Sequence, residues 1–294
     1  MSFEVSTAFV QQYKTNVEML LQQRGSKLRR AVMSDGYTGK AGKAVEQIGP
    51  VTAQKRTTRH ADTPLISTPL DARWVFPTDY EWADLVDDQD KLKMLIDPTS
   101  SYAMNGAMAL GRAIDDEIVQ AAFGDAKTGE DGTQVTPFDT ANQQVPADIG
   151  GGASGMSIAK LRDAKLILMA NEVDIDNDPL FVAMTARQHD DLLSETQAVS
   201  LDYNTKPVLV DGRITGFMGF SFIHTERLGV DGSNHRRLIA WAKSGLHLGV
   251  WNDIATRIGE RADKSHATQV YVKGTFGATR LEEGKVIEVL CAEA

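Results

Sequence analysis

Residues 97–124, DPTSSYAMNGAMALGRAIDDEIVQAAFG, form the most strongly patterned stretch of the chain. The segment opens with Asp97-Pro98-Thr99-Ser100, in which a proline near the first turn and a capping hydroxyl predict the start of a helix. We expect this helix to run from 99 to 123 and to end at Gly124. About 25 residues at 1.5 Å each give a helix about 37 Å long.

The expected helix has one apolar face. Its apolar residues recur at intervals of three and four, as in a helix that packs on a partner: Ala103, Ala107, Leu110, Ile114, Ile118 and Ala121. Asn105, Arg112, Asp116 and Gln120 lie on the other side, and of these Arg112, Asp116 and Gln120 are expected to remain open. The apolar face is expected to pack on late strands that include Tyr271 and residues 286–289.

Upstream of the helix, a basic block is followed by an acidic one. Residues 24–60 carry nine Lys and Arg against two acids, a net charge of +7. Residues 61–140 carry 16 acids and five bases, a net charge of −11. The two blocks are either ordinary solvated surface or the halves of a subunit contact, in which opposed charges steer association and fix register.

The basic block contains a segment that fits neither a packed helix nor a core strand. Gly36, Gly39, Gly42 and Gly49 fall within 14 residues, a density that disfavours a helix. Thr and Ile residues between 51 and 70 then favour extended backbone. We therefore predict that residues 35–76 form a long two-stranded excursion with a glycine-rich base. Because a lone ribbon is only marginally stable in water, this excursion needs a partner to lie on.

The rest of the chain mixes helices and strands without a regular βαβ repeat. We expect an arm with a helix over 1–34, a loop or hairpin over 125–155, and a second helix capped by Ser157. A short helix is expected over 186–195, and strands over 180–185, 208–210, 220–224, 238–241, 246–251, 269–272 and 286–290. This order indicates an α+β fold.

The composition of the 294-residue chain is that of a globular protein, with 42% apolar and 24% charged residues. The net charge of −9 disfavours a general nucleic-acid-coating protein, because phosphate neutralisation drives such binding. The one cysteine, Cys291, can form neither an internal disulfide nor a cysteine-based zinc site, and we expect it to be buried on the last strand. Without a signal pattern or an apolar run of about 20 residues, the sequence predicts a soluble protein made in a cytoplasm.

Motifs for catalysis or ligand binding are incomplete in this sequence. A phosphate loop fails because Tyr37 holds the first glycine position, and a nucleophile elbow fails because Met156 replaces the last glycine. Residues 174–178 begin like a calcium loop, but Pro179 stands where glycine makes the turn, so a helix-to-strand turn is favoured over a weak cation site. The histidines include no helical pair, and His189 is interpreted as a helix-surface residue. The sequence therefore predicts no catalytic, cofactor or metal site.

Several segments in order along the chain carry a resemblance to a known family. Residues 212–222, GRITGFMGFSF, look like the "G-x-I … G-F-x-V" strand in the axial domain of tailed-phage major capsid proteins. Residues 180–193 resemble the strand and helix that precede this strand in the family, and 242–248 resemble its late axial strand. Residues 271–289 resemble the closing strands of the peripheral domain. The excursion at 35–76 and the helix at 99–123 resemble the family's extended loop and spine helix.

The resemblance implies an α+β fold of the type named after the Hong Kong 97 phage. Its parts would be an N-terminal arm over 1–34, an extended β-loop over 35–80, a peripheral domain with the spine helix over 81–152 and 263–294, and an axial domain over 153–262. Such subunits assemble as hexamers and pentamers into an icosahedral shell that encloses DNA. The open polar side of the helix would then face the shell interior or a neighbour.

The resemblance also implies a setting and a set of partners. The protein would be a non-enzymatic part of the virion, assembled in the host cytoplasm without a cofactor or a membrane. Expected partners are neighbouring capsomers, possible separate scaffolding, portal and decoration proteins, and packaged double-stranded DNA through weak non-specific contact. Two alternatives are the shell of an encapsulin-like nanocompartment and an enzyme with an unrecognised site around His189 and 174–178.

The charge blocks supply candidates for the contact between subunits. We expect Lys55, Arg56 or Arg59 of the excursion to meet acids of a neighbouring subunit. The expected acidic partners are Asp87, Asp88 and Asp90.

Overall fold

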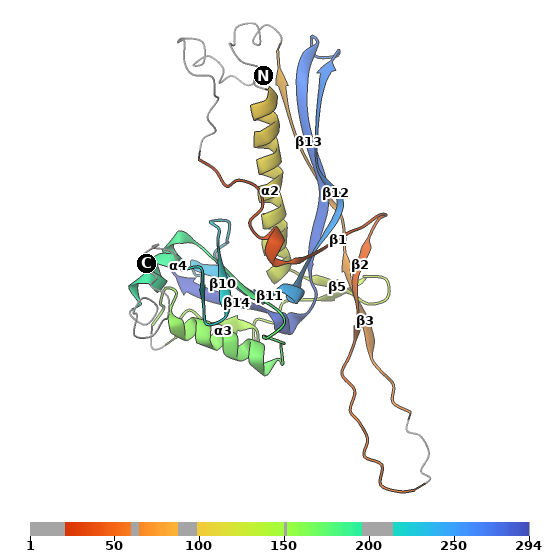
Figure 1. The fold of residues 1–294 in the computed structure, drawn as a ribbon, viewed down its shortest axis with the longest axis vertical. Coiled ribbons are helices and arrows are strands. Elements are labelled where there is room, and N and C mark those ends of the chain that lie inside the picture. Colours follow the sequence, from red (N-terminus) through yellow and green to blue (C-terminus); the bar gives the residue numbers. More distant parts are fainter. Residues whose placement is uncertain (1–20, 60–64, 88–98, 150–151, 196–213, 294) are drawn as a thin grey trace.

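The computed structural model describes residues 21–59, 65–87, 99–149, 152–195 and 214–293. Within these residues the strands form three sheets, and the longest helix stands beside one of them (Figure 1). The expected strand over 208–210 and most of the expected arm lie outside the described residues.

The longest helix, α2 (Thr99–Phe123), has the bounds that its start and stop signals predicted. It runs along a four-stranded sheet with the strand order β1-β12-β13-β4 (Figure 1). The strands are β1 (Met33–Gly36), β4 (Thr78–Val86), β12 (Leu246–Arg261) and β13 (Ala267–Arg280). β12 and β13 form a long antiparallel hairpin, with β4 antiparallel to β13 and β1 parallel to β12.

The predicted apolar face of α2 packs on this sheet, chiefly on β13. Leu110, Ile114 and Ile118 are at most 3% exposed. Gly106 allows close approach, because a Cβ there would lie 2.5 Å from the Trp82 ring on β4. The expected partner strand with Tyr271 is confirmed as β13. The expected second partner over 286–289 lies instead in another sheet.

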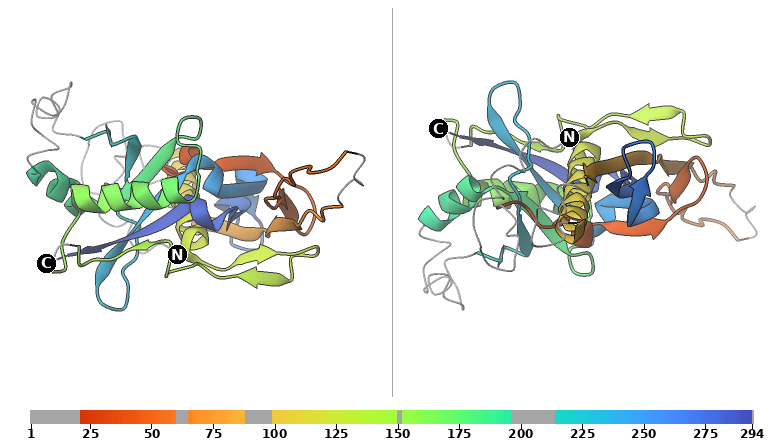
Figure 2. Two further views of the ribbon diagram at one scale, coloured as in Figure 1. Left: turned by 90° about the horizontal axis from the view of Figure 1, so that it is seen from below. Right: turned by 90° about the horizontal axis from the view of Figure 1, so that it is seen from above.

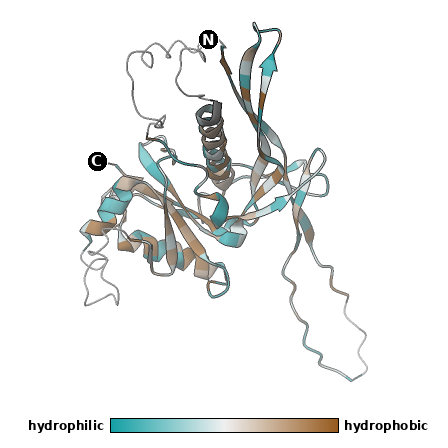
Figure 3. Ribbon diagram, turned by 45° about the horizontal axis from the view of Figure 1, so that its top comes forward, coloured by the Kyte–Doolittle hydropathy of each residue, from teal (hydrophilic) through white to brown (hydrophobic). Residues whose placement is uncertain are grey.

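That second sheet has six strands in the order β7-β14-β11-β8-β10-β9. They are β7 (Gln144–Val145), β8 (Leu180–Met184), β9 (Gly216–Phe217), β10 (Phe220–His224), β11 (His235–Ala242) and β14 (Val286–Ala292). The helices α3 (Ile158–Ala170) and α4 (Ala186–Ser194) lie beside it and alternate hydrophilic with hydrophobic residues (Figure 3). Ser157 caps α3 by accepting the Lys160 N–H, as predicted.

The main hydrophobic core lies around β11, whose residues 238–242 are fully buried. Trp241 also donates its Nε1–H to the Ala31 carbonyl at 2.9 Å, so the segment before β1 is tied to this core. Cys291 is buried on β14 with its sulfur 3.7 Å from Met156 Sδ, which confirms the expectation for the one cysteine.

The chain passes between the two sheets twice at one place. β11 leads into β12 through η4 (Lys243–Gly245), and β13 leads into β14 through η5 (Glu283–Lys285). The crossings touch, because Leu281 N–H donates to the Gly245 carbonyl at 2.9 Å and a Cβ at Gly245 would lie 2.8 Å from Lys285 Cβ. Strand pairing therefore places β12 in the four-stranded sheet beside α2, and β14 in the six-stranded sheet beside β11. The expected ranges placed β12 in the axial domain over 153–262 and β14 in the peripheral domain over 263–294.

A third sheet forms the base of the predicted excursion. Its order is β2-β3-β5-β6, made of β2 (Gly42–Ile48), β3 (Leu70–Val75), β5 (Ala126–Thr128) and β6 (Gln134–Thr136). Beyond the antiparallel pair β2–β3, residues 49–59 and 65–69 have no regular structure and reach away from the body of the molecule (Figures 1 and 2).

The excursion is open only in part. Every residue of 50–59 and 65–69 is exposed. Ala72, Arg73 and Val75 are buried, however, because β3 packs against β5 and the end of β13. The expectation that 35–76 is largely unpacked within its own subunit is therefore met by the distal part and wrong for the base.

Candidate interaction surfaces

The described part of the excursion between β2 and β3, residues 49–59 and 65–69, is called the extended loop below. Its three cations, Lys55, Arg56 and Arg59, are exposed, and Arg56 donates only to the nearby Thr58 carbonyl at 3.1 Å. No described residue forms an ion pair with any of the three.

Large apolar side chains of the extended loop and its base are also exposed. Leu65 is 100% exposed, Leu70 75%, Ile48 72% and Val51 55%. Single exposed apolar residues are common, but a series of them on a projecting ribbon marks an interaction surface. The exposed apolar residues and the exposed cations together indicate that the extended loop lies on another molecule.

The acids expected to meet these cations are not beside them in one subunit. Asp87 is exposed at the end of β4, next to the start of β13, where Val86 pairs with Thr268. Asp88 and Asp90 lie outside the described residues. Figure 1 shows this end of β4 and the extended loop at opposite ends of the molecule.

A second acidic row lies on the face of the four-stranded sheet that α2 leaves open. Tyr80 and Trp82 of β4 face α2, so the alternating residues Asp79 and Glu81 face away from it. Asp79 accepts from Thr275 Oγ1 at 2.6 Å, and Glu81 accepts from Tyr271 at 2.9 Å. The Glu81 carboxylate raises the pKa of Tyr271 because it accepts a hydrogen bond from the protonated hydroxyl. Alternation along 78–86 was the signal that could have identified this row from the sequence.

A buried carboxylate holds residues 22–30, called the arm segment below, against α2. Asp115 is fully buried and accepts from Ser26 Oγ at 2.5 Å, Lys27 N–H at 3.0 Å and Leu28 N–H at 3.1 Å. It also accepts from Gln23 Nε2. A carboxylate with this many donors is a fixed anchor for the backbone of 23–28.

The expected open polar side of α2 is partly covered at two residues, Arg112 and Asp116. Arg112 donates to Gln22 Oε1 at 2.6 Å, and Asp116 accepts both arms of the Arg227 guanidinium. The pairing with Asp116 raises the pKa of Arg227. The arm segment and the loop after β10 cover this side of the helix, which spacing within the helix could not reveal. Gln120 is exposed, as expected.

Two buried arginines join the end of α2 to the base of the extended loop. Arg280 on β13 is fully buried and donates to the carbonyls of Ala122 at 3.0 Å and Gly124 at 2.8 Å, where the helix dipole favours a cation. Arg73 on β3 donates to the Leu281 carbonyl at 3.0 Å and to Glu283 at 2.7 Å. Burial lowers the pKa of Arg280. This cluster fixes the direction in which the extended loop leaves the body.

The motifs considered for catalysis have local structural roles. Asp174 closes a turn by accepting from Asn177 N at 3.2 Å and Asn177 Nδ2 at 2.8 Å, and these bonds lower its pKa. The predicted helix-to-strand turn is therefore confirmed between α3 and β8. His189 on α4 accepts the Ile214 N–H at 3.1 Å.

Neither a metal-binding cluster nor a membrane-spanning helix is found among the described residues. No group of three His, Cys, Asp or Glu side chains there is placed to hold a metal ion. Among the same residues, no helix combines the length and apolar character needed to cross a membrane.

Comparisons with known proteins agree with this arrangement. The sequence model of one family, described as phage capsid protein, matches residues 5–293. No curated protein sequence matches the chain. Among solved structures, the chain is similar to the capsid of Cyanophage P-SCSP1u, with a TM-score of 0.75, 11% identity, and coverage of 98% of this chain and 94% of that one.

Two further structures show the same likeness. A chain from Mycobacterium phage Che8 gives a TM-score of 0.71 at 14% identity, over 96% of this chain and 97% of that one. The Cyanophage Pam1 capsid gives 0.69 at 14% identity, over 99% of both chains. At these identities the likeness concerns the fold, and it confirms the expected α+β architecture.

Proposed function

Since this chain belongs to the phage capsid protein family, we propose that it acts as the major capsid protein, whose copies tile the shell of a phage head. The observation that carries the proposal is the extended loop, which holds exposed apolar and basic side chains with no cover in its own subunit. Contacts of this head-to-tail kind close into rings when the rotation between copies allows it. Hexamers and pentamers are the rings that an icosahedral shell requires.

The extended loop is proposed to lie on the next subunit of the ring. The run 49–59 holds eleven residues, which at about 3.3 Å per residue give a reach of at most about 36 Å. Lys55, Arg56 and Arg59 would there meet acids that their own subunit holds at its far end (Figure 1). We propose Asp87, Asp88 and Asp90 as one set of partners. Asp79 and Glu81 form a second set, since both lie on the open face of the four-stranded sheet.

We propose that the subunit consists of two units that meet at η4 and η5. The peripheral unit would contain α2 and the four-stranded sheet, and the axial unit the six-stranded sheet with α3 and α4. This division refines the expected boundary near 262, because strand pairing keeps β12 with β13 and β14 with β11. The extended loop would branch from the peripheral unit through its base, β2 and β3, which the Arg73–Glu283 pair holds in place, so the expected range 35–80 is reduced to the part outside β1 and β4.

The proposed role is structural, without catalysis or a cofactor. The side chains of the incomplete motifs serve local turns and helix contacts, which supports this reading. The proposed setting is the virion, assembled in the host cytoplasm, with separate scaffolding, portal and decoration proteins as further partners. A net charge of −9 would keep contact with packaged DNA weak.

The test is assembly of the purified protein, followed by gradient sedimentation and electron microscopy. We expect rings or closed shells from the full chain. A variant in which a short Gly-Ser linker replaces residues 50–68 should stay folded and soluble but should not assemble. A full chain that remains monomeric at all concentrations would refute the proposal. Particles from the natural source that hold a protein cargo and no nucleic acid would instead favour the nanocompartment reading.

A further inference from the structure

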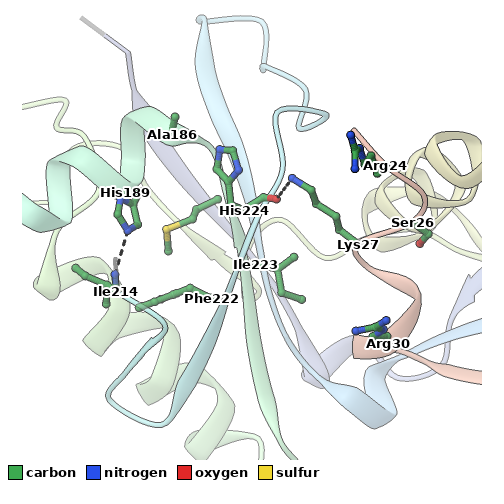
Figure 4. Close-up of a pocket in the computed structure, with 11 residues that line it drawn as sticks. Arg24, Ser26, Lys27, Arg30, Ala186, His189, Ile214, Phe222, Ile223 and His224 are labelled. Atoms are coloured by element: carbon green, nitrogen blue, oxygen red, sulfur yellow. Dashed lines mark hydrogen bonds between the residues drawn. The ribbon is translucent and has the colours of Figure 1, made fainter. Parts of the chain in front are cut away.

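A hollow of about 840 Å³ lies between the arm segment and the six-stranded sheet (Figure 4). Arg24, Lys27 and Arg30 of the arm segment form one wall. Phe222 and Ile223 of β10 contribute apolar side chains on the other side. The hollow is called the arm pocket below.

The arm pocket carries an excess of positive charge. Lys27 Nζ donates to the His224 carbonyl at 2.9 Å, which aims its ammonium group across the pocket. Arg24 and Arg30 are exposed, and neither forms an ion pair with a described residue. Two carboxylates contact residues that line the pocket, and both are already engaged: Asp115 by Ser26, Lys27 and Leu28, and Glu226 by His224 at 2.8 Å and by the Ala186 N–H at 2.7 Å.

The backbone that carries the three cations is held in place before anything binds. The backbone between them is anchored by Asp115, through Ser26, Lys27 and Leu28. A site whose backbone is already ordered loses less conformational entropy on binding than a mobile one. The arm pocket therefore has the properties of a formed site for an anionic segment that also has an apolar side chain.

We infer that the arm pocket binds the acidic turn 129–133 of a second copy of this chain. This inference rests on the proposed shell function, because it places the two copies side by side in a ring. The turn joins β5 to β6 and presents Glu130 and Asp131. Two carboxylates would face the cations of the arm segment, and the half-exposed Val135 would face the apolar side of the pocket.

The acidic turn exposes its two carboxylates to solvent on a rigid backbone. Glu130 and Asp131 are exposed, and no described residue forms an ion pair with either. The turn is rigid, because Trp74 Nε1 donates to the Gly129 carbonyl at 2.8 Å and Asp71 accepts the Gly129 N–H at 2.9 Å. Gly132 adopts φ +68, a left-handed conformation that glycine tolerates best.

The positions of turn and pocket suit a head-to-tail contact. Figures 1 and 2 show the β5–β6 hairpin on the side of the extended loop and the helix α4 on the other side, and Ala186 and His189 of α4 line the pocket. A ring of identical subunits needs complementary chemistry on two different faces. Duplex DNA fits less well, because its phosphates lie on the surface of a rod that cannot enter a hollow with an apolar side.

Charge reversal on each side tests the inference. Arg24→Glu with Arg30→Glu, and Glu130→Lys with Asp131→Lys, should each lower the assembled fraction at least tenfold in gradient sedimentation. Combining all four substitutions should restore assembly, because the charges are exchanged between the faces. Arg162→Glu on α3, whose side chain is 72% exposed, is the control for altered surface charge and should assemble normally. Circular dichroism of the unassembled subunits checks that each variant is folded.

A second measurement covers the case in which the fourfold variant does not fold. Cysteines placed at Arg30 and Asp131 should form a disulfide between subunits, since Cys291 is buried and does not compete. Normal assembly of both double variants would overturn the inference. It would also be overturned if the fourfold variant folded but did not assemble and the two introduced cysteines formed no disulfide. Particles that form normally but lose nucleic acid would overturn it as well, because that result assigns the pocket to DNA. Failure of the unaltered chain to assemble would count against the proposed function instead.

Discussion

Asp115 on α2 accepts the backbone N–H of Leu28 at 3.1 Å, and both residues are fully buried. The same carboxylate accepts from Ser26 and Lys27, so one side chain satisfies a series of donors from a segment almost 90 positions earlier in the chain. The arm segment is therefore part of the folded subunit from 22 onward rather than a free tail.

Removal of this carboxylate should loosen the arm segment. Asp115→Ala leaves several buried donors without an acceptor, and we expect the free energy of unfolding to fall by about 3 kcal/mol. Trypsin should then cleave at Arg24, Lys27 or Arg30 much faster than in the unaltered subunit. Gln120→Ala on the exposed side of α2 should change the unfolding free energy by less than about 0.5 kcal/mol. Equal cleavage rates for the two variants would show that Asp115 does not anchor the segment.

The apolar face of α2 gives a second prediction. Ile114 is 2% exposed against the four-stranded sheet, so Ile114→Asp places an unpaired charge in an apolar contact or forces the carboxyl to remain protonated. We expect insoluble subunits from this variant. Ile114→Val, which removes one methyl group, should cost about 1 kcal/mol and should assemble. Soluble, assembling Ile114→Asp protein would show that the face is assigned wrongly.

The pair between Glu293 and Arg236 predicts a pH dependence. Two hydrogen bonds of 2.8 Å from Arg236 lower the pKa of Glu293 from 4.5 to about 2. Because the folded-state pKa lies below the unfolded one, this stabilisation is present above about pH 4.5 and is lost as the pH falls towards 2. Glu293→Gln should cost about 1 kcal/mol at pH 7, since solvent screens a pair near the surface.

The measurement is denaturant unfolding of both proteins between pH 2 and pH 7. The difference in unfolding free energy should shrink steadily below pH 4.5. A difference that stays constant over this range would mean that the pair contributes through packing and not through charge.

The extended loop supplies the fourth prediction. Arg56→Glu with Arg59→Glu should leave the unassembled subunit folded, because both side chains are exposed, and should strongly reduce particle yield. Raised salt should weaken the subunit contact only where the paired charges are exposed to solvent. Dissolved ions screen exposed charges over the Debye length, which is about 8 Å at physiological salt. The Arg162→Glu variant again serves as the control. A normal yield of particles from the double variant would remove these arginines from the subunit contact.

Elements with local start and stop signals could be predicted from the sequence. The helix over 99–123 was found with the expected bounds, and the strand over 220–224 likewise. α4 ends at Ser194, one residue before the expected end, and Thr185 and Gln188 form its capping box. In each case the side chains that define the element lie within a few residues of it.

Features that depend on distant partners could not be predicted in this way. β12 runs to Arg261 instead of 251, because β13 pairs with a stretch whose own residues are polar and largely exposed. The sheet membership of β14 likewise depends on β11 and β7. Asp115 lies within an Asp-Asp-Glu run that suggests a solvated surface, and only the arm segment reveals it as buried.

The position of Cys291 gives the molecule an internal reporter. The sulfur is the chain's only thiol, and burial on β14 raises its pKa to about 12, so almost no reactive thiolate exists near neutral pH. A thiol reagent can modify it only when the six-stranded sheet and the helices α3 and α4 beside it open as a unit. The labelling rate therefore measures how often this unit opens in the free subunit, and the slowing of that rate in particles measures how far assembly closes it.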